Sequence, residues 1–296
     1  MISILIPTYN YNTYILVEEL YKQISKENVD FEIIVVDDAS PKNEITQENY
    51  KINTLKNCLF ERNEINLGRS KNRNLLISKA KYKWVLLLDG DVYPKEKKFI
   101  TNYLNSINCS DKNIFFGGIE YNKKTPNDEE MLRWVFGKKR EEINLQTRLL
   151  KPYHHALISN ILIKKDLFLT FSFDKEITNY GYEDILFILN LKKNKIKIEH
   201  IDNAVFHMNL ENSQIFLDKF HSSLKNLKII LDQKKINTHD TSLTKTYYWI
   251  SKLKMIKLTA YFFKIFKSTL TQNLVSSNPS LLIFDIYRLG YFCTLK

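Results

Sequence analysis

The sequence predicts an α/β fold, in which helices flank a mostly parallel sheet and a helical extension follows at the C-terminus. Short, unbroken apolar runs at Ile2–Ile6, Phe31–Val36 and Trp84–Leu88 are separated by helical patterns. Such runs are typical of strands that are buried on both faces of a parallel sheet. From about Glu211 onward, apolar residues recur at helical spacing. A chain of 296 residues can hold one large domain or two modest ones.

The composition is that of a globular protein with a strong positive charge. The hydrophobic fraction is 44% and the charged fraction 26%, both ordinary values. A formal net charge of +11 indicates attraction to nucleic acid, a membrane surface or a phosphorylated substrate. The three cysteines lack metal-binding spacing, which fits a reducing compartment. The first apolar run indicates a strand rather than a signal peptide, and no apolar stretch reaches about 18 residues. We therefore expect a cytoplasmic protein, either free or peripheral at the inner membrane face.

Each of the three apolar runs ends in polar residues. The first run ends at Pro7-Thr8-Tyr9-Asn10, the second at Asp37-Asp38 and the third at Asp89-Gly90-Asp91. A helix predicted over Tyr14–Lys26 connects the first two strands and favours a parallel pair with a right-handed crossover. Because the C-terminal ends of parallel strands share one edge of a sheet, we expect these polar residues to lie together where open α/β sheets bind ligands.

Further along the chain, helices and strands alternate less regularly. The expected helices are at about Arg69–Ala80, Lys95–Asn105 and from Glu183 onward, and the expected strands are at Ile114–Gly117, Ala156–Ile163 and Ile198–Val205. Between them, Asn122–Pro152 is polar and charged. A long charged segment between strands is often functional or else disordered.

The third strand end, Asp89-Gly90-Asp91, is the main candidate site. Two carboxylates spaced i, i+2 around a glycine can face one ligand across a tight turn. Their oxygens are hard ligands that suit Mg²⁺ or Mn²⁺. The alternative is a simple turn, which Asp and Gly both favour. Neither the dinucleotide fingerprint nor the P-loop occurs, so a nucleotide here would be bound by side chains and single backbone groups.

The helical C-terminal part contains a basic segment. Lys245–Leu270 has six lysines and no acidic residue, and apolar residues share one side of a helical wheel. A basic amphipathic helix can lie on an anionic membrane. The alternative is an ordinary helix that packs on the rest of the protein and exposes its lysines to water.

In these motifs, the chain resembles the family 2 glycosyltransferases with the GT-A fold. The matching stretches are ISILIPTYN, FEIIVVDDAS, NLGRSKNRN, WVLLLDGDVY, NILIKKDLF and GYEDILF, in the family's order over Met1–Asn209. The resemblance implies a Rossmann-like catalytic domain over residues 1–209, with a nucleotide-sugar-binding half at 1–118 and an acceptor-binding half at 119–209. Residues 210–296 form a helical region outside the resemblance.

The resemblance also implies a nucleotide site at the first strand ends. Pro7, Thr8 and Tyr9 would border the base and ribose, and Asp38 would accept a hydrogen bond from a uracil imide. The alternative for Asp38 and its neighbour Asp37 is a cap and turn. Arg73 stands where the family often has a basic residue near the nucleotide. Its alternative is a solvated helix face.

A metal site is implied by the likeness of Asp89 and Asp91 to the family's D-x-D motif. Asp91 would bind Mn²⁺ or Mg²⁺ bridging the donor diphosphate, while Asp89 would contact the ribose or a metal-bound water. Gly90 would let the turn close. His207, after the last strand, stands where related enzymes supply a further metal ligand, and a nitrogen ligand favours Mn²⁺.

The catalytic base is implied by the likeness of Glu183-Asp184 to the family's E-D motif. Asp184 would be the general base of a single in-line displacement that inverts the anomeric centre. Glu183 would bind the acceptor or orient the sugar. The segment Lys138–Pro152, with Tyr153, His154 and His155, would be a loop that closes over both substrates.

The expected function is an inverting, divalent-metal-dependent glycosyltransferase of the hexosyltransferase class. It would move a hexose or N-acetylhexosamine from a UDP-sugar to a hydroxyl of a glycan or lipid-linked acceptor in cell-surface polysaccharide biosynthesis. One alternative is a sugar nucleotidyltransferase, but Pro7–Asn12 lacks the glycines and cations of such a phosphate loop. Another is a basic, non-catalytic protein that binds a membrane or nucleic acid. Because no nucleic-acid motif occurs, we expect no nucleic-acid partner.

Overall fold

The computed structural model describes residues 1–177 and 180–295, which form two compact units. Within these residues, the first unit comprises Met1–Asn122, 140–177 and Phe187–Asn209. The second comprises Lys123–Lys139, 180–186 and 210–295. The second unit therefore contains two segments from within the first 209 residues as well as the C-terminal region.

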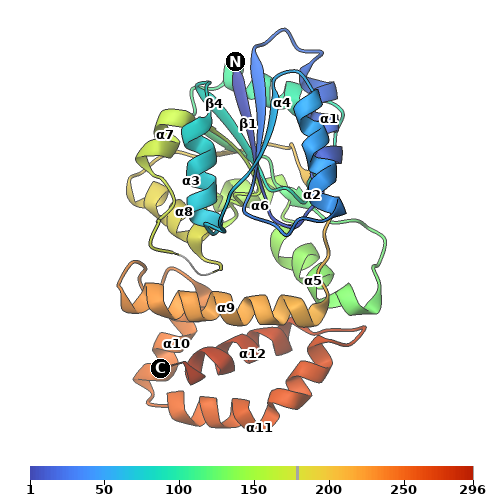
Figure 1. Ribbon diagram of the computed structural model, residues 1–296. Coiled ribbons are helices and arrows are strands. Elements are labelled where there is room, and N and C mark those ends of the chain that lie inside the picture. The colour runs from blue at the N-terminus through green and yellow to red at the C-terminus, as the bar shows by residue number, and fades with distance from the viewer. Residues whose placement is uncertain (178–179, 296) are drawn as a thin grey trace. The chain divides into compact units, whose positions relative to one another are not determined.

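A mixed sheet forms the centre of the first unit (Figure 1). Its seven strands within the described chain are, in spatial order, β3 (Cys58–Arg62), β2 (Phe31–Asp37), β1 (Ile2–Thr8), β4 (Trp84–Leu88), β8 (Asn160–Lys164), β6 (Ile114–Phe116) and β9 (Glu199–His200). The strands from β3 to β4 run parallel, β8 is antiparallel to both neighbours, and β9 is parallel to β6. The prediction of a mostly parallel sheet flanked by helices, with a helical C-terminal part, is confirmed.

The apolar runs form the central strands because helices cover both faces of the sheet. Figure 1 shows α1 (Tyr14–Ile24) and α4 (Phe99–Cys109) on one face, and α3 (Arg69–Lys79) and α7 (Lys165–Thr170) on the other. Every residue of β4 is buried. A strand covered on both sides needs apolar side chains in both directions, which explains the unbroken runs.

A smaller sheet extends the same unit. Its three strands within the described residues are β5 (Val92–Pro94), β10 (Val205–His207) and β7 (Ile119–Glu120), in that order. Strand β10 runs antiparallel to β5 and parallel to β7. This sheet joins chain positions just after the Asp-Gly-Asp turn to the end of the unit.

The single strand expected at Ile198–Val205 is wrong. The segment is divided between β9 in the large sheet and β10 in the small one. Side chains bond the intervening carbonyls: Arg148 Nη2 donates to Ile201 O, and Asn160 Nδ2 donates to Asn203 O. These contacts replace the ladder bonds that a continuous strand would make.

Other boundaries also differ from expectation. The helix expected from Lys95 begins at Phe99, because Lys95 N donates to Ala204 O and holds that residue beside the small sheet. The charged stretch Asn122–Pro152 is substantially helical. Its elements are η2 (Asp128–Glu130), α5 (Met131–Phe136), the π-helix η3 (Gly137–Glu141) and α6 (Leu145–Leu150).

The remaining short elements complete the first unit. They are α2 (Glu44–Asn49), η1 (Tyr50–Thr54) and η4 (Pro152–His154). Helix α8 (Glu183–Lys193) begins among the residues of the second unit, and its later residues pack with the first unit's core.

Helices make up the second unit. Besides α5, they are α9 (Ser213–Asp232), α10 (Ser242–Lys252), α11 (Ile256–Leu274) and α12 (Leu281–Thr294), with α12 between α9 and α11 (Figure 1). Aromatic rings fill the core, where Phe216, Phe220 and Phe284 contact one another. No helix among the described residues is long and apolar enough to cross a membrane.

The continuous helix expected over Lys245–Leu270 is wrong. The chain leaves helical geometry between α10 and α11, where Lys254 has a φ of 59°. A residue in the left-handed region cannot continue a right-handed helix, so it separates the two.

Candidate functional site

The pairing of β5 with β10 brings Asp91 and His207 together. Asp91 immediately precedes β5, and His207 ends β10 opposite Val92. Met208 N also donates to Asp91 O at 2.9 Å, which extends the pairing by one bond. As a result, His207 Nε2 lies 3.7 Å from Asp91 Oδ2. Two candidate metal ligands from distant parts of the sequence therefore lie next to each other.

The imidazole of His207 is held by an aromatic neighbour. The ring of Tyr121 stacks on it with centroids 5.3 Å apart and planes inclined by 16°. Tyr121 follows β7, the strand parallel to β10, so the small sheet positions both rings. This role of Tyr121 was not predictable from the sequence, because the pairing of two very short strands has no recognisable pattern.

The donor set formed by Asp91 and His207 fits a divalent cation. Two atoms that each lie about 2.1 Å from one ion can be at most about 4.2 Å apart, and the observed separation is 3.7 Å. Within the described chain, no group of three or more His, Cys, Asp or Glu side chains is arranged to hold a metal. Two protein ligands are nevertheless sufficient where substrate phosphates complete the coordination, as is usual for Mg²⁺.

Asp89 is paired with Arg73. Arg73 Nη2 donates to Asp89 Oδ1 at 2.9 Å, and the arginine is only 2% exposed. Burial would raise the pKa of Asp89, but the guanidinium groups of Arg73 and Arg69 outweigh it and hold that pKa below its ordinary value. The alternative that placed Arg73 on a solvated helix face is wrong. A buried arginine in a polar helical segment cannot be told from an exposed one by spacing alone.

Gly90 lies in a crowded position behind the turn. A Cβ there would come within 2.9 Å of Thr13 Cγ2 and 3.2 Å of the carbonyl oxygen of Pro7. The glycine is therefore required by close packing of the β4 and β1 ends. Its backbone does not adopt the left-handed region. Thr8 is buried at the same contact, while Tyr9 is exposed at the end of β1.

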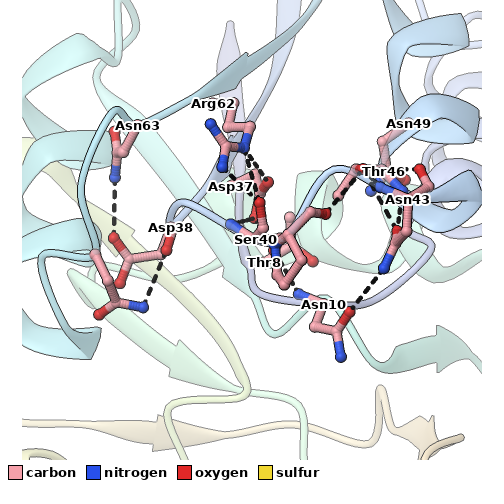
Figure 2. Close-up of polar contacts among 12 residues, drawn as sticks. Thr8, Asn10, Asp37, Asp38, Ser40, Asn43, Thr46, Asn49, Arg62 and Asn63 are labelled. Atoms are coloured by element: carbon pink, nitrogen blue, oxygen red, sulfur yellow. Dashed lines mark hydrogen bonds and ion pairs between the residues drawn. The ribbon is translucent and has the colours of Figure 1, made fainter.

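Asp37 and Asp38, at the end of β2, have different surroundings (Figure 2). Asp38 Oδ1 accepts hydrogen bonds from Asn63 Nδ2 at 3.0 Å and Leu67 N at 2.8 Å, and its Oδ2 accepts one from Gly68 N at 2.9 Å. This carboxylate therefore organises the loop that leads into α3. A carboxylate has about four acceptor positions, and these hydrogen bonds use three of them.

Asp37 has the turn-capping role that the sequence left open. It accepts hydrogen bonds from the backbone and hydroxyl of Ser40, and Arg62 Nε lies 3.8 Å from its Oδ2 (Figure 2). Burial raises its pKa. Because Asp37 is fully buried, it supports the turn rather than a ligand.

The Glu183-Asp184 motif belongs to the second unit and begins α8. The residues before it have left-handed backbones, with φ of 91° at Gly181 and 69° at Tyr182. A Cβ on Gly181 would come within 2.5 Å of Ser223 Cβ on α9. The turn that precedes the motif is therefore shaped by direct contact with α9.

Two further contacts hold this turn. Asn226 Nδ2 on α9 donates to Gly181 O. Burial raises the pKa of the Tyr182 hydroxyl, although the guanidinium of Arg288 on α12 opposes the rise. Glu183 itself is 2% exposed. The C-terminal helices, which the sequence motifs do not cover, thus support the segment that carries Asp184.

The segment expected to form a closing loop is anchored by a buried arginine. Arg148 on α6 donates through Nη1 to Phe116 O, through Nη2 to Ile201 O and through Nε to Ile143 O. Gly118, with a φ of 89°, leaves room for this guanidinium, since a Cβ there would lie 2.9 Å from it. Helix α6 is therefore part of the folded sheet edge. Closure over the substrates stays a prediction.

His200 completes the contacts of Arg148. Arg148 Nη1 lies 3.2 Å from His200 Nδ1, and His200 Nε2 lies 2.9 Å from Pro152 O. Since an arginine can only donate, Nδ1 accepts and Nε2 carries the proton. Burial lowers the pKa of His200 to about 4. This histidine is therefore a neutral structural residue.

A comparison with protein families assigns the chain. The family model described as glycosyl transferase family 2 matches residues 3–170, which is more than half of the chain. The chain belongs to glycosyl transferase family 2. The matched region contains the Asp-Gly-Asp turn, Arg73 and Asp38, but ends before Glu183 and His207.

Two sequence relatives of this family 2 member are named as uncharacterized glycosyltransferases. One from Haemophilus influenzae is 34% identical over 93 residues, which are 31% of this chain and 29% of that protein. One from Methanocaldococcus jannaschii is 22% identical over 268 residues, which are 90% of this chain and 85% of that protein. The first match spans less than a third of the relative's length.

Solved structures share the fold of this family 2 chain. One is TarS of S. aureus, residues 1–349, in complex with UDP-GlcNAc, which is 21% identical in sequence. The match covers 76% of this chain and 66% of that chain, with a TM-score of 0.50. Another is the mannosyltransferase PcManGT of Pyrobaculum calidifontis, in complex with GDP-Man and Mn²⁺, which is 10% identical in sequence. The match covers 99% of this chain and 84% of that chain, with a TM-score of 0.59. The predicted GT-A fold is confirmed.

Proposed function

We propose that this family 2 protein is an inverting, divalent-metal-dependent glycosyltransferase. In this proposal it moves a hexose or N-acetylhexosamine from a UDP-sugar to a hydroxyl of a glycan or lipid-linked acceptor in cell-surface polysaccharide biosynthesis. The observation that carries the proposal is the convergence of Asp91 and His207, 3.7 Å apart, in a chain of this family. A carboxylate and an imidazole beside the strand ends are suited to the diphosphate end of a nucleotide sugar.

The donor nucleotide is proposed to lie along the first strand ends. Pro7, Thr8 and Tyr9 would border the base and ribose, and the acceptor position left on Asp38 suits the N–H donor of a uracil. The solved structures include complexes with UDP-GlcNAc and with GDP-Man, so the fold accommodates either nucleotide. We propose UDP because a carboxylate in this place can accept a hydrogen bond from the uracil imide and because the family resemblance implies it.

The proposed metal is Mn²⁺ or Mg²⁺, held by Asp91 and His207. When bound, the ion would offset the negative charge that develops on the leaving diphosphate. Arg73 keeps Asp89 ionised and fixed in the same turn. Asp89 can then accept hydrogen bonds from the ribose or from an ordered water. In this arrangement the two aspartates have separate tasks.

The acceptor side is proposed to depend on Asp184. A carboxylate that removes the proton from the attacking hydroxyl is sufficient for a single in-line displacement, which inverts the anomeric centre. The assignment rests on the family's E-D motif. Buried Glu183 would orient the sugar or the acceptor. We also propose residues 1–209 as the catalytic domain, with the donor half at 1–118 and the acceptor half at 119–209.

A panel of nucleotide sugars tests this function directly. The protein is incubated with UDP-, GDP- and dTDP-sugars with and without Mn²⁺, and thermal shift and donor hydrolysis are both recorded. We expect stabilisation and slow hydrolysis with a UDP-hexose or UDP-N-acetylhexosamine. Once an acceptor is found, Asp184→Asn should abolish transfer while leaving the donor-induced thermal shift unchanged. Wild-type transfer rates in Asp184→Asn would overturn the assignment of the base.

A further inference from the structure

Helix α11 has two apolar faces, of which its own unit uses only one. Phe263 and Leu274 are buried in the aromatic core beside α12. At about 100° per residue, Leu258, Phe262 and Ile265 lie on a different side of the helix. A solvent-facing helix side is normally polar. A second apolar side therefore requires an explanation outside the packing of this unit.

The exposed apolar side continues beyond α11 onto the preceding turn and helix. We call it the α10–α11 apolar face, and its members are between 42% and 66% exposed: Trp249, Leu253, Met255, Leu258, Tyr261, Phe262, Ile265 and Phe266. Half of these residues are aromatic. Single exposed apolar residues are common on proteins, but eight within one helix pair mark an interaction site.

The segment that carries this face has charges of a single sign. Residues 241–284 contain six lysines and no acidic residue. Lys252 Nζ lies 4.7 Å from the ring centroid of Tyr248 and 5.4 Å from that of Trp249, so its charge lies beside the aromatic residues. Lys257, Lys264 and Lys267 lie along α11. Whatever covers the apolar face must therefore be negatively charged around its edge.

We infer that the α10–α11 apolar face docks on an anionic lipid bilayer. Apolar and aromatic side chains would enter the region between headgroups and acyl chains, while lysines would extend along the surface to the phosphates. Trp and Tyr favour this interface because they combine an apolar body with a polar group. No described helix can span a bilayer, so the contact is peripheral.

A bilayer fits this face better than a second copy of the chain. Two identical faces would bring their lysines together, and residues 241–284 contain no acidic residue to neutralise them, so that repulsion opposes a symmetric dimer. The docking is independent of the sugar that the enzyme transfers. It goes beyond the proposed function by naming the surface on which the enzyme works, which is where a lipid-linked acceptor would be found.

Co-sedimentation with liposomes tests the inference. The full chain is mixed with vesicles of phosphatidylcholine alone or with 30% phosphatidylglycerol, at low and at high salt. We expect binding to the anionic vesicles, at least about tenfold weaker binding to the neutral ones, and a loss at high salt. Absence of binding to the anionic vesicles would overturn the inference.

Matched variants separate the apolar and charged contributions. The apolar triple variant carries Leu258→Ser, Phe262→Ser and Ile265→Ser, and its affinity for vesicles should be at least tenfold lower. The lysine triple variant carries Lys257→Gln, Lys264→Gln and Lys267→Gln, and it should lose the preference for anionic lipid. The control variant changes three exposed apolar residues of the first unit, with Ile15→Ser, Ile45→Ser and Leu169→Ser. It should bind vesicles like the wild type. Equal loss in this control would contradict a specific face.

Two further readouts keep the result interpretable. Circular dichroism and thermal unfolding must show that the variants fold, and light scattering measures the oligomeric state. A wild-type dimer that becomes monomeric in the apolar triple variant, without any vesicle binding, would show self-association instead. Donor hydrolysis in solution should stay unchanged in the triple variants, so failure of the membrane inference is distinguishable from failure of the proposed reaction.

Discussion

His207 Nε2 lies 3.7 Å from Asp91 Oδ2, although the two residues lie far apart in the sequence. The antiparallel pairing of β5 and β10 is responsible, since it places His207 opposite Val92. A metal bound by this pair depends on the correct register of two three-residue strands. Substitutions of either ligand should therefore affect metal binding without disturbing the large sheet.

Replacing the imidazole should weaken the binding of Mn²⁺ more than that of Mg²⁺. Because a nitrogen ligand favours Mn²⁺, His207→Asn should raise the Kd for Mn²⁺ at least about tenfold. Isothermal titration of each metal into the protein with excess UDP measures this. The exposed His239→Asn serves as a control. Unchanged Mn²⁺ affinity in His207→Asn would exclude His207 as a ligand.

Removing Arg73 should destabilise the fold as well as the site. Its guanidinium is buried and bonded to Asp89, so Arg73→Ala leaves a partly buried carboxylate without this partner. We expect a loss of about 3 kcal/mol in the free energy of unfolding, measured by urea denaturation. Lys71→Ala changes an exposed cation on the same helix and should alter stability by less than about 0.5 kcal/mol. Equal effects would contradict a special role for Arg73.

Contacts from α9 should control catalysis through the turn that precedes Asp184. Asn226→Ala removes the donor to Gly181 O, and Gly181→Ala introduces a clash with Ser223. Both variants should lower kcat at least tenfold with little change in the donor KM, because the turn before Asp184 shifts. Ser222→Ala on the exposed side of α9 is the control. An increase in donor KM without a change in kcat would speak against this positioning role.

Acid should destabilise the protein through His200. Its pKa in the folded protein, about 4, lies below the ordinary value of 6.5. Between these pH values the imidazole is therefore protonated in the unfolded chain but not in the folded protein. Stability is unaffected above pH 6.5 and falls as pH decreases from 6.5 to 4, by up to about 3 kcal/mol. Urea unfolding at several pH values measures this.

The variant His200→Gln isolates the contribution of that one histidine. A glutamine amide can accept from Arg148 and donate to Pro152 O without titrating. The difference in unfolding free energy between wild type and variant should therefore depend on pH only between 6.5 and 4. Parallel pH profiles for the two proteins would contradict the assignment of His200 as a buried neutral histidine.

The fold was predictable from the sequence because its signals are local. Unbroken apolar runs such as Trp84–Leu88 must be buried on both faces, and the polar residues after them mark one sheet edge. The break at Lys254 was not predictable, because lysine is a good helix former and enters the left-handed region here only in its structural context. The division of Ile198–Val205 depended on Arg148, whose partners are distant in sequence.

The candidate site was predictable in its residue types but not in its organisation. The carboxylates of Asp89 and Asp91 were evident as a motif, yet their different partners, Arg73 and His207, follow from tertiary packing. Asp38 was expected to contact a base, with a cap and turn as the alternative, and the structure shows that it holds the loop at Leu67 and Gly68. Such roles require knowledge of which backbone donors lie nearby.

Metal-dependent release of UDP from a UDP-sugar tests the central claim most directly. Initial rates are compared for wild type, Asp91→Asn and the control Asp111→Asn, which changes an exposed carboxylate, each with Mn²⁺ and with EDTA. We expect release by wild type and Asp111→Asn with Mn²⁺, loss of release in EDTA, and a fall of at least about 100-fold in Asp91→Asn. UDP release that persists in EDTA, or at the wild-type rate in Asp91→Asn, would contradict the central claim.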